Sequence, residues 1–499
     1  MSGNPATLIP VALFLLLGLG ITFFIRYQSR KRREAGFVSE YFIGSRSLGA
    51  FVLAMTTIAT YGSVSSFVGG PGQAWNVGFG WVYMATIQVT ALFLLYGIMG
   101  KKMALISRKL GAITVIDVIR ARYNSNALAN VSAIVIVLFF GATMVAQFVG
   151  GAKLFEAVTG YSYEVGLAIF GIAAILFTAL GGFRGVAFVD TLCGIAMIVG
   201  IFVLAGGILD AGGGYTNIMA NLQAHNPELL EPLGGGDMPI GLYFTQWLLV
   251  GVFTFCLPQS VVRCMGYKDS KSLRQAMIIG TIIIGAMMIG VTALGVLAKG
   301  ILPADLSAYG NSVDNIIPLA IVQSLPPWLA GVAIIGPVAA SISTVASLLI
   351  FSSSSIIKDM YLHYREEKNN PPTGKQVARY SQVFTFIVGV IVFVLSVVPP
   401  DVIWKINMFA FGGLETAFCW VLVMGLFWKK ANKVGALLSM IGGTLSYCAT
   451  MALGITFFGL HQIVIGISVS LLCMVIGSLL TKPKETEKEL KTRAVFFGE

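Results

Sequence analysis

The feature that most constrains this chain is a repeat of apolar segments about 20 residues long, the length that a helix needs to cross a bilayer's hydrocarbon core. Thirteen such windows occur in the 499 residues. They lie near residues 7–25, 47–68, 80–99, 127–152, 164–182, 186–209, 240–257, 276–298, 326–350, 377–398, 403–427, 435–457 and 461–480. Continuous apolar runs favour helices over a barrel, whose strands alternate polar and apolar residues. The sequence therefore predicts an all-α polytopic membrane protein with about 13 transmembrane helices.

Composition and charge support a membrane location and predict an orientation. Hydrophobic residues make up 56% of the chain and charged residues 11%, with a mean hydropathy of +0.84, whereas a soluble domain carries roughly 25% charged residues. Basic residues recur at 26–33, 101–102, 108–109, 120–122, 184, 263–274, 358–379, 429–433 and after 482, always on the side that 13 spans would make cytoplasmic. Only Lys153, Lys299 and Lys405 fall on the other side. We therefore expect an outside N-terminus and a cytoplasmic C-terminus, and the net charge of +11 gives no reason to expect nucleic-acid binding.

The side chains that enzymes and metal sites need are not grouped in this sequence. The six cysteines form no C-x-x-C pair, and the three histidines fall in predicted loops, so zinc and iron–sulfur sites are not expected. An intramembrane enzyme would also need a nucleophile with an adjacent base. The tail after residue 482 is short for a signalling domain. We expect neither an enzyme nor a sensor, and no required protein partner.

The order of the spans indicates an inverted repeat. Spans two to six and spans seven to eleven form two groups of five, and an odd number makes the second group start from the opposite face of the membrane. The predicted organisation is an extra helix with a basic loop (1–46), the first repeat (47–209), an extracytoplasmic loop (210–239), the second repeat (240–427), two extra helices (428–481) and a cytoplasmic tail (482–499).

The first helix of each repeat is predicted to be interrupted. In the first repeat, ATYGSVSSFVGGPG (59–72) crowds hydroxyls against glycines and a proline, which predicts a break from Ser63 to Gly72. In the second, Pro258 follows the apolar run. Unwound backbone is tolerated in a membrane where it lines a cavity, and there it can bind ions or polar substrate groups. The alternative is that the small residues let helices pack closely.

A second group of hydroxyls lies in the ninth span. Ala340, Ser343, Thr344 and Ser347 are spaced at 3, 4 and 7 residues, so they share one helical face. Their hydroxyls could simply bond to carbonyls four residues earlier. A stripe of small polar positions is also typical of an oxygen-lined site for an alkali cation.

Few ionisable residues lie inside the spans, where each is costly unless it is paired or solvated. Two acids do, Asp190 and Glu415, and an ion pair with the nearby Arg184 is one interpretation of Asp190. No partner for Glu415 can be named. No Lys or Arg is predicted near a span centre.

These motifs are similar to those of the sodium:solute symporter family. The segments concerned are TALGGF (178–183), GGPG (69–72), SISTVAS (341–347) and GLFWKKANKVGALLSMIGG (425–443). The last matches a family signature over nearly twenty positions, and the resemblance covers essentially the whole chain. It implies a LeuT-like core in a bacterial inner membrane and a secondary active transporter that couples solute import to sodium entry by alternating access.

The resemblance also implies which residues bind sodium. The main site would use backbone carbonyls of Ala59, Gly62 and Ala340 with the hydroxyls of Ser343 and Thr344. Some relatives have a second sodium site, which would use Asp190, Ser343 and Ser347 here. One serine of that pattern is Ala346 in this chain.

The resemblance extends to the substrate. EYFIGSRSLGAFVLAMT (40–56), ATYGSVSSFVGGPG (59–72), VRCMGYKDSKS (262–272) and FGGLE (411–415) are most similar to the branch that transports pantothenate. The proline-transporting branch has an acid where Tyr61 stands, which argues against proline. The alternative is a sodium symporter for another small organic solute, such as a monocarboxylate, an amino acid or a sugar acid.

An anionic substrate then needs polar contacts without a nearby basic residue. Half-helix N-termini, hydroxyls and the sodium ion itself can supply them. The candidate substrate-binding residues are Ser63, Ser66, Phe67, Gln88 and Gln147, with Trp75 packing nearby.

Overall fold

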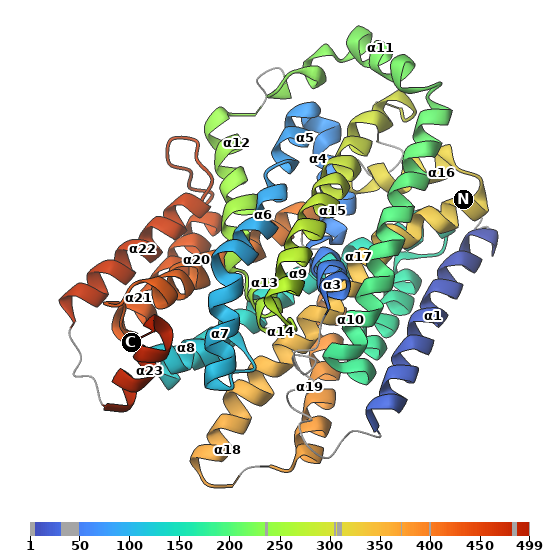
Figure 1. Cartoon of the computed structure of the whole chain (residues 1–499). Helices are drawn as coiled ribbons and strands as arrows, with labels where there is room; N and C mark the ends of the chain where they lie inside the picture. Colours follow the sequence, from blue (N-terminus) through green and yellow to red (C-terminus); the bar gives the residue numbers. More distant parts are fainter. Residues whose placement is uncertain are drawn as a thin grey trace.

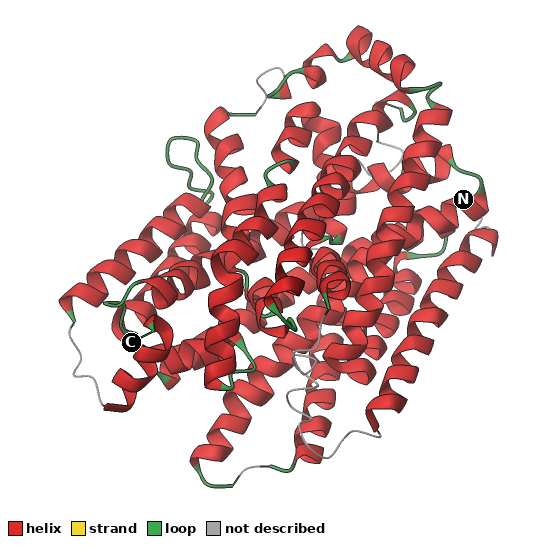
Figure 2. Cartoon of the chain, viewed as in Figure 1, coloured by secondary structure: helices red, strands yellow, loops and turns green. Residues whose placement is uncertain are grey.

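The protein is a bundle of helices. The computed structural model describes residues 5–30, 49–234, 238–303, 306, 312–370, 372–398, 401–481 and 487–498, which contain no strand (Figure 2). Helix α1 (Pro5–Arg30) runs along one flank, and α21 (Lys433–Ala452) with α22 (Ile463–Leu480) along the opposite flank (Figure 1). The all-α prediction is confirmed, while the basic loop predicted after the first span lies mostly outside the described residues.

Ten helices of the described residues are long and apolar enough to cross a membrane, or up to twelve if each of two bent pairs counts as one span. Two of the ten, Tyr163–Leu180 and Gly185–Ala211, lie within α10 (Tyr163–Ala211). The predicted window at 377–398 corresponds to α19 (Gly374–Leu395), whose apolar part is shorter than a full span. The count of 13 therefore stays a prediction.

The first bent pair is broken earlier than the sequence predicted. Helix α3 (Ala50–Tyr61) ends before Gly62 and Ser63, and the chain resumes as a π-helical turn η2 (Ser65–Gly69) and α4 (Gly70–Val77), bent by 61°. The predicted break from Ser63 to Gly72 is wrong for its glycine-rich half, which is helical. Pro71 fits there because the first turn of a helix needs no N–H from it.

The glycines of that half serve close packing, the alternative weighed above. A Cβ on Gly69 would lie 3.3 Å from the backbone nitrogen of Trp404, and one on Gly72 would lie 2.5 Å from the carbonyl oxygen of Val313. Both are distances at which a side chain crowds its neighbours. The broken helix therefore packs directly on the backbone of two other segments.

The second bent pair begins the predicted second repeat. Helix α12 (Ile240–Trp247) continues through η6 (Leu248–Val252) and η7 (Phe253–Cys256) to Leu257, which is extended, and α13 (Pro258–Val261) and α14 (Arg263–Gly266) follow at 43°. Pro258 is the first residue after the break, as predicted. Both predicted repeats thus start with an interrupted helix.

The remaining elements surround these two pairs. They are α5 (Phe79–Ala85), α6 (Gln88–Leu94), η3 (Leu95–Gly100), α7 (Lys101–Leu110), α8 (Val115–Tyr123), α9 (Asn126–Thr159), α11 (Tyr215–His225), η4 (Pro227–Leu230), α15 (Ser270–Leu297), η8 (Ala298–Gly300), η10 (Val313–Asn315), α16 (Ile316–Ser324), α17 (Pro327–Ser353), η11 (Ser354–Leu362), α18 (His363–Glu367), α20 (Ile403–Phe427) and α23 (Glu487–Phe497). Helix α17 is buried almost throughout and packs against α1, α9 and α10. Helices α11 and α23 lie at opposite ends of the bundle (Figure 1).

Candidate functional site

The break in the first bent pair meets the hydroxyl stripe of α17. The hydroxyl of Ser343 donates to the carbonyl oxygen of Ala59 at 2.8 Å, and that of Thr344 donates to the carbonyl oxygen of Gly62 at 3.3 Å. Both hydroxyls also lie within 3.1 Å of the carbonyl oxygen of Ala340. The five residues that the family resemblance assigned to sodium therefore come together from two helices far apart in the sequence.

Local backbone geometry explains why these oxygens are available. A helix leaves its last carbonyls without intrahelical partners, and α3 ends at Tyr61 while Gly62 is extended (φ −70°, ψ 119°). Ala59 and Ser343 are fully buried and Thr344 is 4% exposed. The set is neutral and oxygen-only, which suits a hard monovalent cation.

The side chain of Gln147, in α9, stabilises the break between α3 and η2. The amide Oε1 of Gln147 accepts the N–H of Val64 at 2.9 Å, and the backbone carbonyl of Gln147 accepts the hydroxyl of Ser341 at 2.7 Å. Gln147 therefore ties the broken helix and α17 to α9. It does not line the central cavity described below, where it was expected to contact substrate.

Asp190 has a charged partner that the sequence did not suggest. Its carboxylate accepts the hydroxyl of Thr56 at 2.8 Å and lies 3.7 Å from Arg263, with both charged side chains 1% exposed. Arg263 also donates to Thr56 at 2.9 Å, to Ser347 at 3.1 Å and to Thr60. In this conformation the guanidinium occupies the side of Asp190 and Ser347 where a second sodium was expected.

The expectation that no basic residue approaches a span centre is therefore wrong. Arg263 was grouped with a cytoplasmic basic segment, but it is the first residue of α14, which follows the second break and the short helix α13, and it is buried against α3 and α17. The available signal was its setting in SVVRCMGY, where apolar residues flank a single charge. The side chain of Arg184, the other partner considered, lies outside the described residues.

A small cavity lies beside the break, and we call it the central cavity. It has a volume of about 30 Å³ and is lined by Tyr61, Ser63, Ser65, Ser66, Gly70, Trp81, Met84, Ala85, Gln88, Val250, Met288, Thr292, Trp404, Asn407, Met408 and Phe411. None of these side chains carries a charge. A drug-sized ligand needs a pocket of roughly 300 Å³ or more, so the cavity in this conformation is too small for such a ligand.

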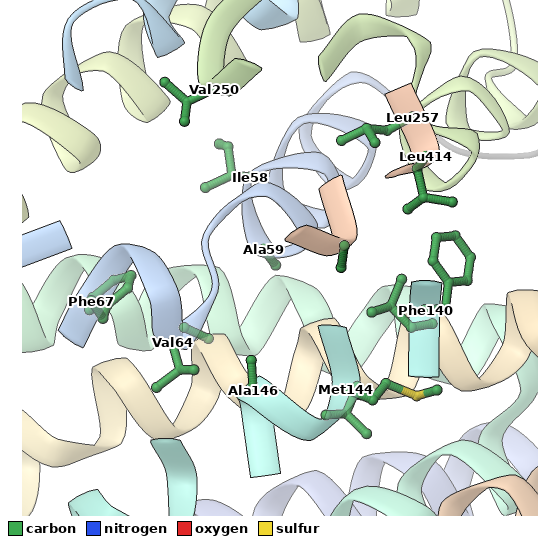
Figure 3. Close-up of a cluster of buried hydrophobic side chains, with 14 of the residues drawn as sticks. Ile58, Ala59, Val64, Phe67, Phe140, Met144, Ala146, Val250, Leu257 and Leu414 are labelled. Atoms are coloured by element: carbon green, nitrogen blue, oxygen red, sulfur yellow. The ribbon is translucent and has the colours of Figure 1, made fainter. Parts of the chain in front are cut away.

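Three of the five predicted substrate contacts line the central cavity: Ser63, Ser66 and Gln88. Phe67 does not; its ring is 2% exposed and packs in an apolar cluster with Ala59 and Val64 (Figure 3). Trp75 does not either; it is 3% exposed, with the ammonium of Lys299 4.2 Å from its ring centroid.

Sequence reasoning did not select three polar residues of this cavity, Ser65, Thr292 and Asn407, and two of them have an unpaired polar atom. The hydroxyl of Ser65 and the amide Oδ1 of Asn407 are buried and have no hydrogen-bond partner among the described residues. Buried polar atoms without a protein partner commonly await a ligand or water. Asn407 stands in an apolar helix, INMFAF, where a lone amide was the only sequence signal.

A wider cavity, which we call the vestibule, adjoins the central one. It has a volume of about 1070 Å³, and Trp81, Trp404 and Met408 line both cavities. The two indole rings meet edge to face, with centroids 5.1 Å apart and planes at 72°. This aromatic pair therefore lies at the boundary between the two cavities.

Metal clusters and disulfides do not appear in the described part of the chain. No group of His, Cys, Asp and Glu there could hold a metal ion. All six cysteines are free, and Cys193, Cys256, Cys264 and Cys419 are buried.

Known proteins resemble this chain in sequence along most of its length. Residues 41–443 match the description "Sodium:solute symporter family". The sodium/pantothenate symporter of Escherichia coli (strain K12) is 41% identical over 472 residues, which cover 94% of this chain and 96% of that protein. A protein of the same description from Haemophilus influenzae is 39% identical over 495 residues, covering 99% and 100%. The osmoregulated proline transporter of Bacillus subtilis is 26% identical, covering 94% and 95%.

Solved structures share the fold at low sequence identity. A Na+-coupled sialic acid symporter in a substrate-bound outward-open state superimposes with a TM-score of 0.79 at 18% identity, covering 97% of this chain and 99% of that one. A nucleobase-cation-symport-1 transporter with a bound hydantoin gives a TM-score of 0.56 at 14% identity, covering 91% and 98%. These likenesses support the predicted architecture of an interrupted-helix transporter core.

Proposed function

Because the chain belongs to the sodium:solute symporter family, we propose that it is a secondary active transporter that imports pantothenate together with sodium. Members of this family move solutes and make or break no substrate bond, so the protein is a transporter and not an enzyme. The observation that carries the proposal is the contact of Ser343 with Ala59 and of Thr344 with Gly62, seen in a chain 41% identical to a sodium/pantothenate symporter.

Sodium is proposed to bind between the broken helix and α17. The carbonyl oxygens of Ala59, Gly62 and Ala340 and the hydroxyls of Ser343 and Thr344 would be its ligands. In the structure, the two hydroxyls donate to the carbonyls. With the ion, the hydroxyl protons would turn away and the lone pairs would face the cation. Sodium would thereby fix α17 against the first broken helix, and the substrate would bind a pre-ordered site.

The substrate is proposed to bind in an expanded form of the central cavity. Pantothenate carries a carboxylate, hydroxyls and an amide, and the cavity offers hydroxyls and amides from Ser63, Ser65, Ser66, Gln88 and Asn407. An amino acid would bring an ammonium group, and the lining has no carboxylate to bind it. The hydroxyl of Tyr61 donates a hydrogen bond to the hydroxyl of Thr254 at 2.6 Å. The neutral lining therefore favours pantothenate, or another carboxylate that lacks an ammonium group.

Alternating access would then proceed in two steps. The vestibule is proposed to face the outside, and separation of Trp81 from Trp404 would admit substrate to the central cavity. Rocking of the helices that carry the two breaks would next open a path to the cytoplasm. Because sodium and substrate favour the same state, each should raise the affinity for the other by the same factor.

Ion stoichiometry sets the accumulation that this cycle can reach. One sodium with one anion moves no net charge, so a tenfold sodium gradient supplies about 1.4 kcal/mol, or about tenfold accumulation. A second cation would add about 2.3 kcal/mol from a potential of 100 mV. The proposed second sodium site consists of Asp190, Ser343 and Ser347. Sodium can bind there only if the side chain of Arg263 moves away from Asp190 and Ser347. The second site is refuted if Asp190→Asn leaves the sodium dependence of uptake unchanged.

Orientation and domain organisation are proposed from charge and topology. The N-terminus would lie outside and the C-terminal tail in the cytoplasm of a bacterial inner membrane. Two inverted repeats, 47–209 and 240–427, would form the transporting core. Single cysteines introduced into α11 and α23 test the orientation when a reagent labels them from one side of intact cells.

Counterflow in proteoliposomes tests the substrate. Vesicles that hold the purified protein and unlabelled pantothenate should accumulate labelled pantothenate only when sodium is present. A panel of labelled monocarboxylates, proline and sugar acids tests the alternative, a sodium symporter for another small organic solute. Strong counterflow of one of these, with none of pantothenate, would overturn the proposed substrate while leaving sodium coupling intact.

A further inference from the structure

Glu415 is a fully buried acid that the proposed cycle does not use. It lies in the middle of α20, is 0% exposed, and neither carboxyl oxygen has a hydrogen-bond partner among the described residues. Its neighbours Leu414, Thr416 and Ala417 are also 0% exposed. The carboxyl group is therefore enclosed on all sides without the polar contacts that a buried acid normally has.

The groups around Glu415 come from both helix breaks. Tyr61 is the last residue of α3, before the first break, and Cys256 is the last residue of η7, before the second. Both lie close enough to interact electrostatically with Glu415, as do Cys419 on its own helix and Tyr447 of α21. These titratable neighbours are all neutral when protonated, and none of them is basic.

Packing fixes α20 against the second break. The thiol of Cys256 donates to the carbonyl oxygen of Cys419 at 3.9 Å, one helical turn beyond Glu415. Leu414 and Leu257, the extended residue of the break, belong to the same buried cluster (Figure 3). A movement of the broken segment away from α20 would therefore open the surroundings of Glu415.

Asp190 provides the contrast within the same molecule. It is equally buried, but Arg263 lies 3.7 Å away and Thr56 donates a hydrogen bond to it. A bare carboxylate without a counter-charge costs several kcal/mol in such a place. Glu415 has no such counter-charge in the described structure, so the neutral acid is its stable form there.

We propose that Glu415 is a proton-binding site of the transport cycle. It carries a proton in the conformation described here, and it exchanges that proton with water when the segment from α12 to α14 moves away from α20. This inference rests on the proposed function, because the proton would travel inward with sodium and pantothenate. One sodium, one proton and one monovalent anion together move a single positive charge, so the membrane potential would drive uptake without a second sodium.

Proteoliposomes that enclose a pH-sensitive dye provide the test. With sodium and pantothenate added outside, wild-type vesicles should acidify inside by about one proton per pantothenate, and an inward gradient of one pH unit should raise accumulation up to about tenfold. Glu415→Gln, which resembles the protonated form, should still exchange labelled pantothenate but should show neither effect. Glu487→Gln, in the exposed tail helix where Glu487 pairs with Lys491, is the matched control and should behave as wild type.

The outcomes are distinct. Wild-type uptake of pantothenate without any change of internal pH would overturn the proton site, whether or not Glu415→Gln folds. A sodium-to-pantothenate flux ratio that falls by one in Glu415→Gln would identify sodium as the cation at Glu415 and would also overturn it. If wild-type vesicles take up no pantothenate at all, the proposed substrate fails, and infrared spectroscopy then decides on Glu415. A protonated carboxyl band at neutral pH that disappears in Glu415→Gln supports the site, and the same spectrum in both proteins refutes it.

Discussion

The hydroxyl of Ser343 donates a 2.8 Å hydrogen bond to the carbonyl oxygen of Ala59, across 284 residues of sequence. The contact joins the helix that begins one predicted repeat to a helix deep in the other. The carbonyl is available for this bond because α3 ends two residues after Ala59, which leaves it without a helical partner. The proposed coupling of sodium to solute depends on this junction.

Removing the hydroxyl of Ser343 should weaken sodium activation. For Ser343→Ala we expect the sodium concentration at half-maximal uptake to rise about tenfold or more, because losing one ligand of a dehydrated ion costs at least ~1.4 kcal/mol. Sodium titration of uptake measures it. Ser352→Ala is the control, because Ser352 lies on the same helix, is 0% exposed and has no hydrogen-bond partner among the described residues. Equal titrations for wild type and Ser343→Ala would remove Ser343 from the site.

Breaking the pair of Asp190 and Arg263 should destabilise the protein more than removing both charges. Each of Asp190→Asn and Arg263→Gln leaves one buried charge unpaired, a change that costs roughly 3–5 kcal/mol in proteins. We expect the melting temperature of each single variant to fall in detergent, and that of the double variant to recover in part. Strictly additive losses would show that the two side chains do not interact energetically.

The aromatic pair of Trp81 and Trp404 should slow the escape of bound substrate. An edge-to-face pair contributes about 0.5–1.5 kcal/mol, so Trp404→Ala should speed pantothenate dissociation roughly two- to thirteenfold. Stopped-flow displacement of a bound labelled substrate measures the rate. Trp328→Ala, at an indole that is 59% exposed, is the matched control. An unchanged rate in Trp404→Ala would exclude the pair as a barrier.

Asn407 should contribute to substrate affinity but not to sodium affinity. Losing one hydrogen bond costs about 1 kcal/mol, so Asn407→Ala should weaken pantothenate binding about fivefold. Asn407→Asp should weaken it more, because it places a negative charge beside an anionic substrate. Calorimetry at saturating sodium measures both, and sodium binding without substrate should be unchanged. A gain in affinity for Asn407→Asp would point instead to a cationic substrate.

His461 makes stability depend on pH at one end of α22. Burial lowers the pKa of its imidazole from 6.5 to about 4, and its Nδ1 accepts the N–H of Ile463, the first residue of the helix. The neutral form is favoured in the folded protein, so this stabilisation is present above pH 6.5 and is lost as the pH falls towards 4, to a total of roughly 3 kcal/mol. Melting temperatures at pH 7 and pH 4.5 measure the change. His461→Gln should reduce this pH dependence, and an unchanged pH dependence would contradict the assignment.

The sequence was sufficient for the membrane class, and the residues that the family resemblance assigned to sodium lie together in the structure, while their binding of sodium stays a prediction. Apolar length and periodicity are local properties, and the spacing of Ala340, Ser343 and Thr344 defines one helical face without any tertiary information. The position of the first break was less predictable. From the sequence, Gly69 and Gly72 could indicate either a helix break or close packing of helices. Only their contacts with Trp404 and Val313 in the structure show that they allow close packing.

The charged and polar residues of the site were harder to predict because their roles depend on distant partners. Arg263 was interpreted as a loop residue, since a basic side chain after an apolar run usually marks a membrane boundary. Only the fold brings Asp190 and Thr60 to it. Gln147 and Asn407 are both lone amides in apolar helices, yet one holds a backbone N–H and the other lines the cavity.

The bond between Gln147 and Val64 has a consequence for the energetics of turnover. The side chain of Gln147, and not the substrate, accepts the N–H of Val64 that the break exposes. The break would therefore persist when the transporter has no substrate bound. The return of the empty transporter would then require no refolding of the first core helix. Such a transporter would keep its substrate-binding site assembled from one transport cycle to the next.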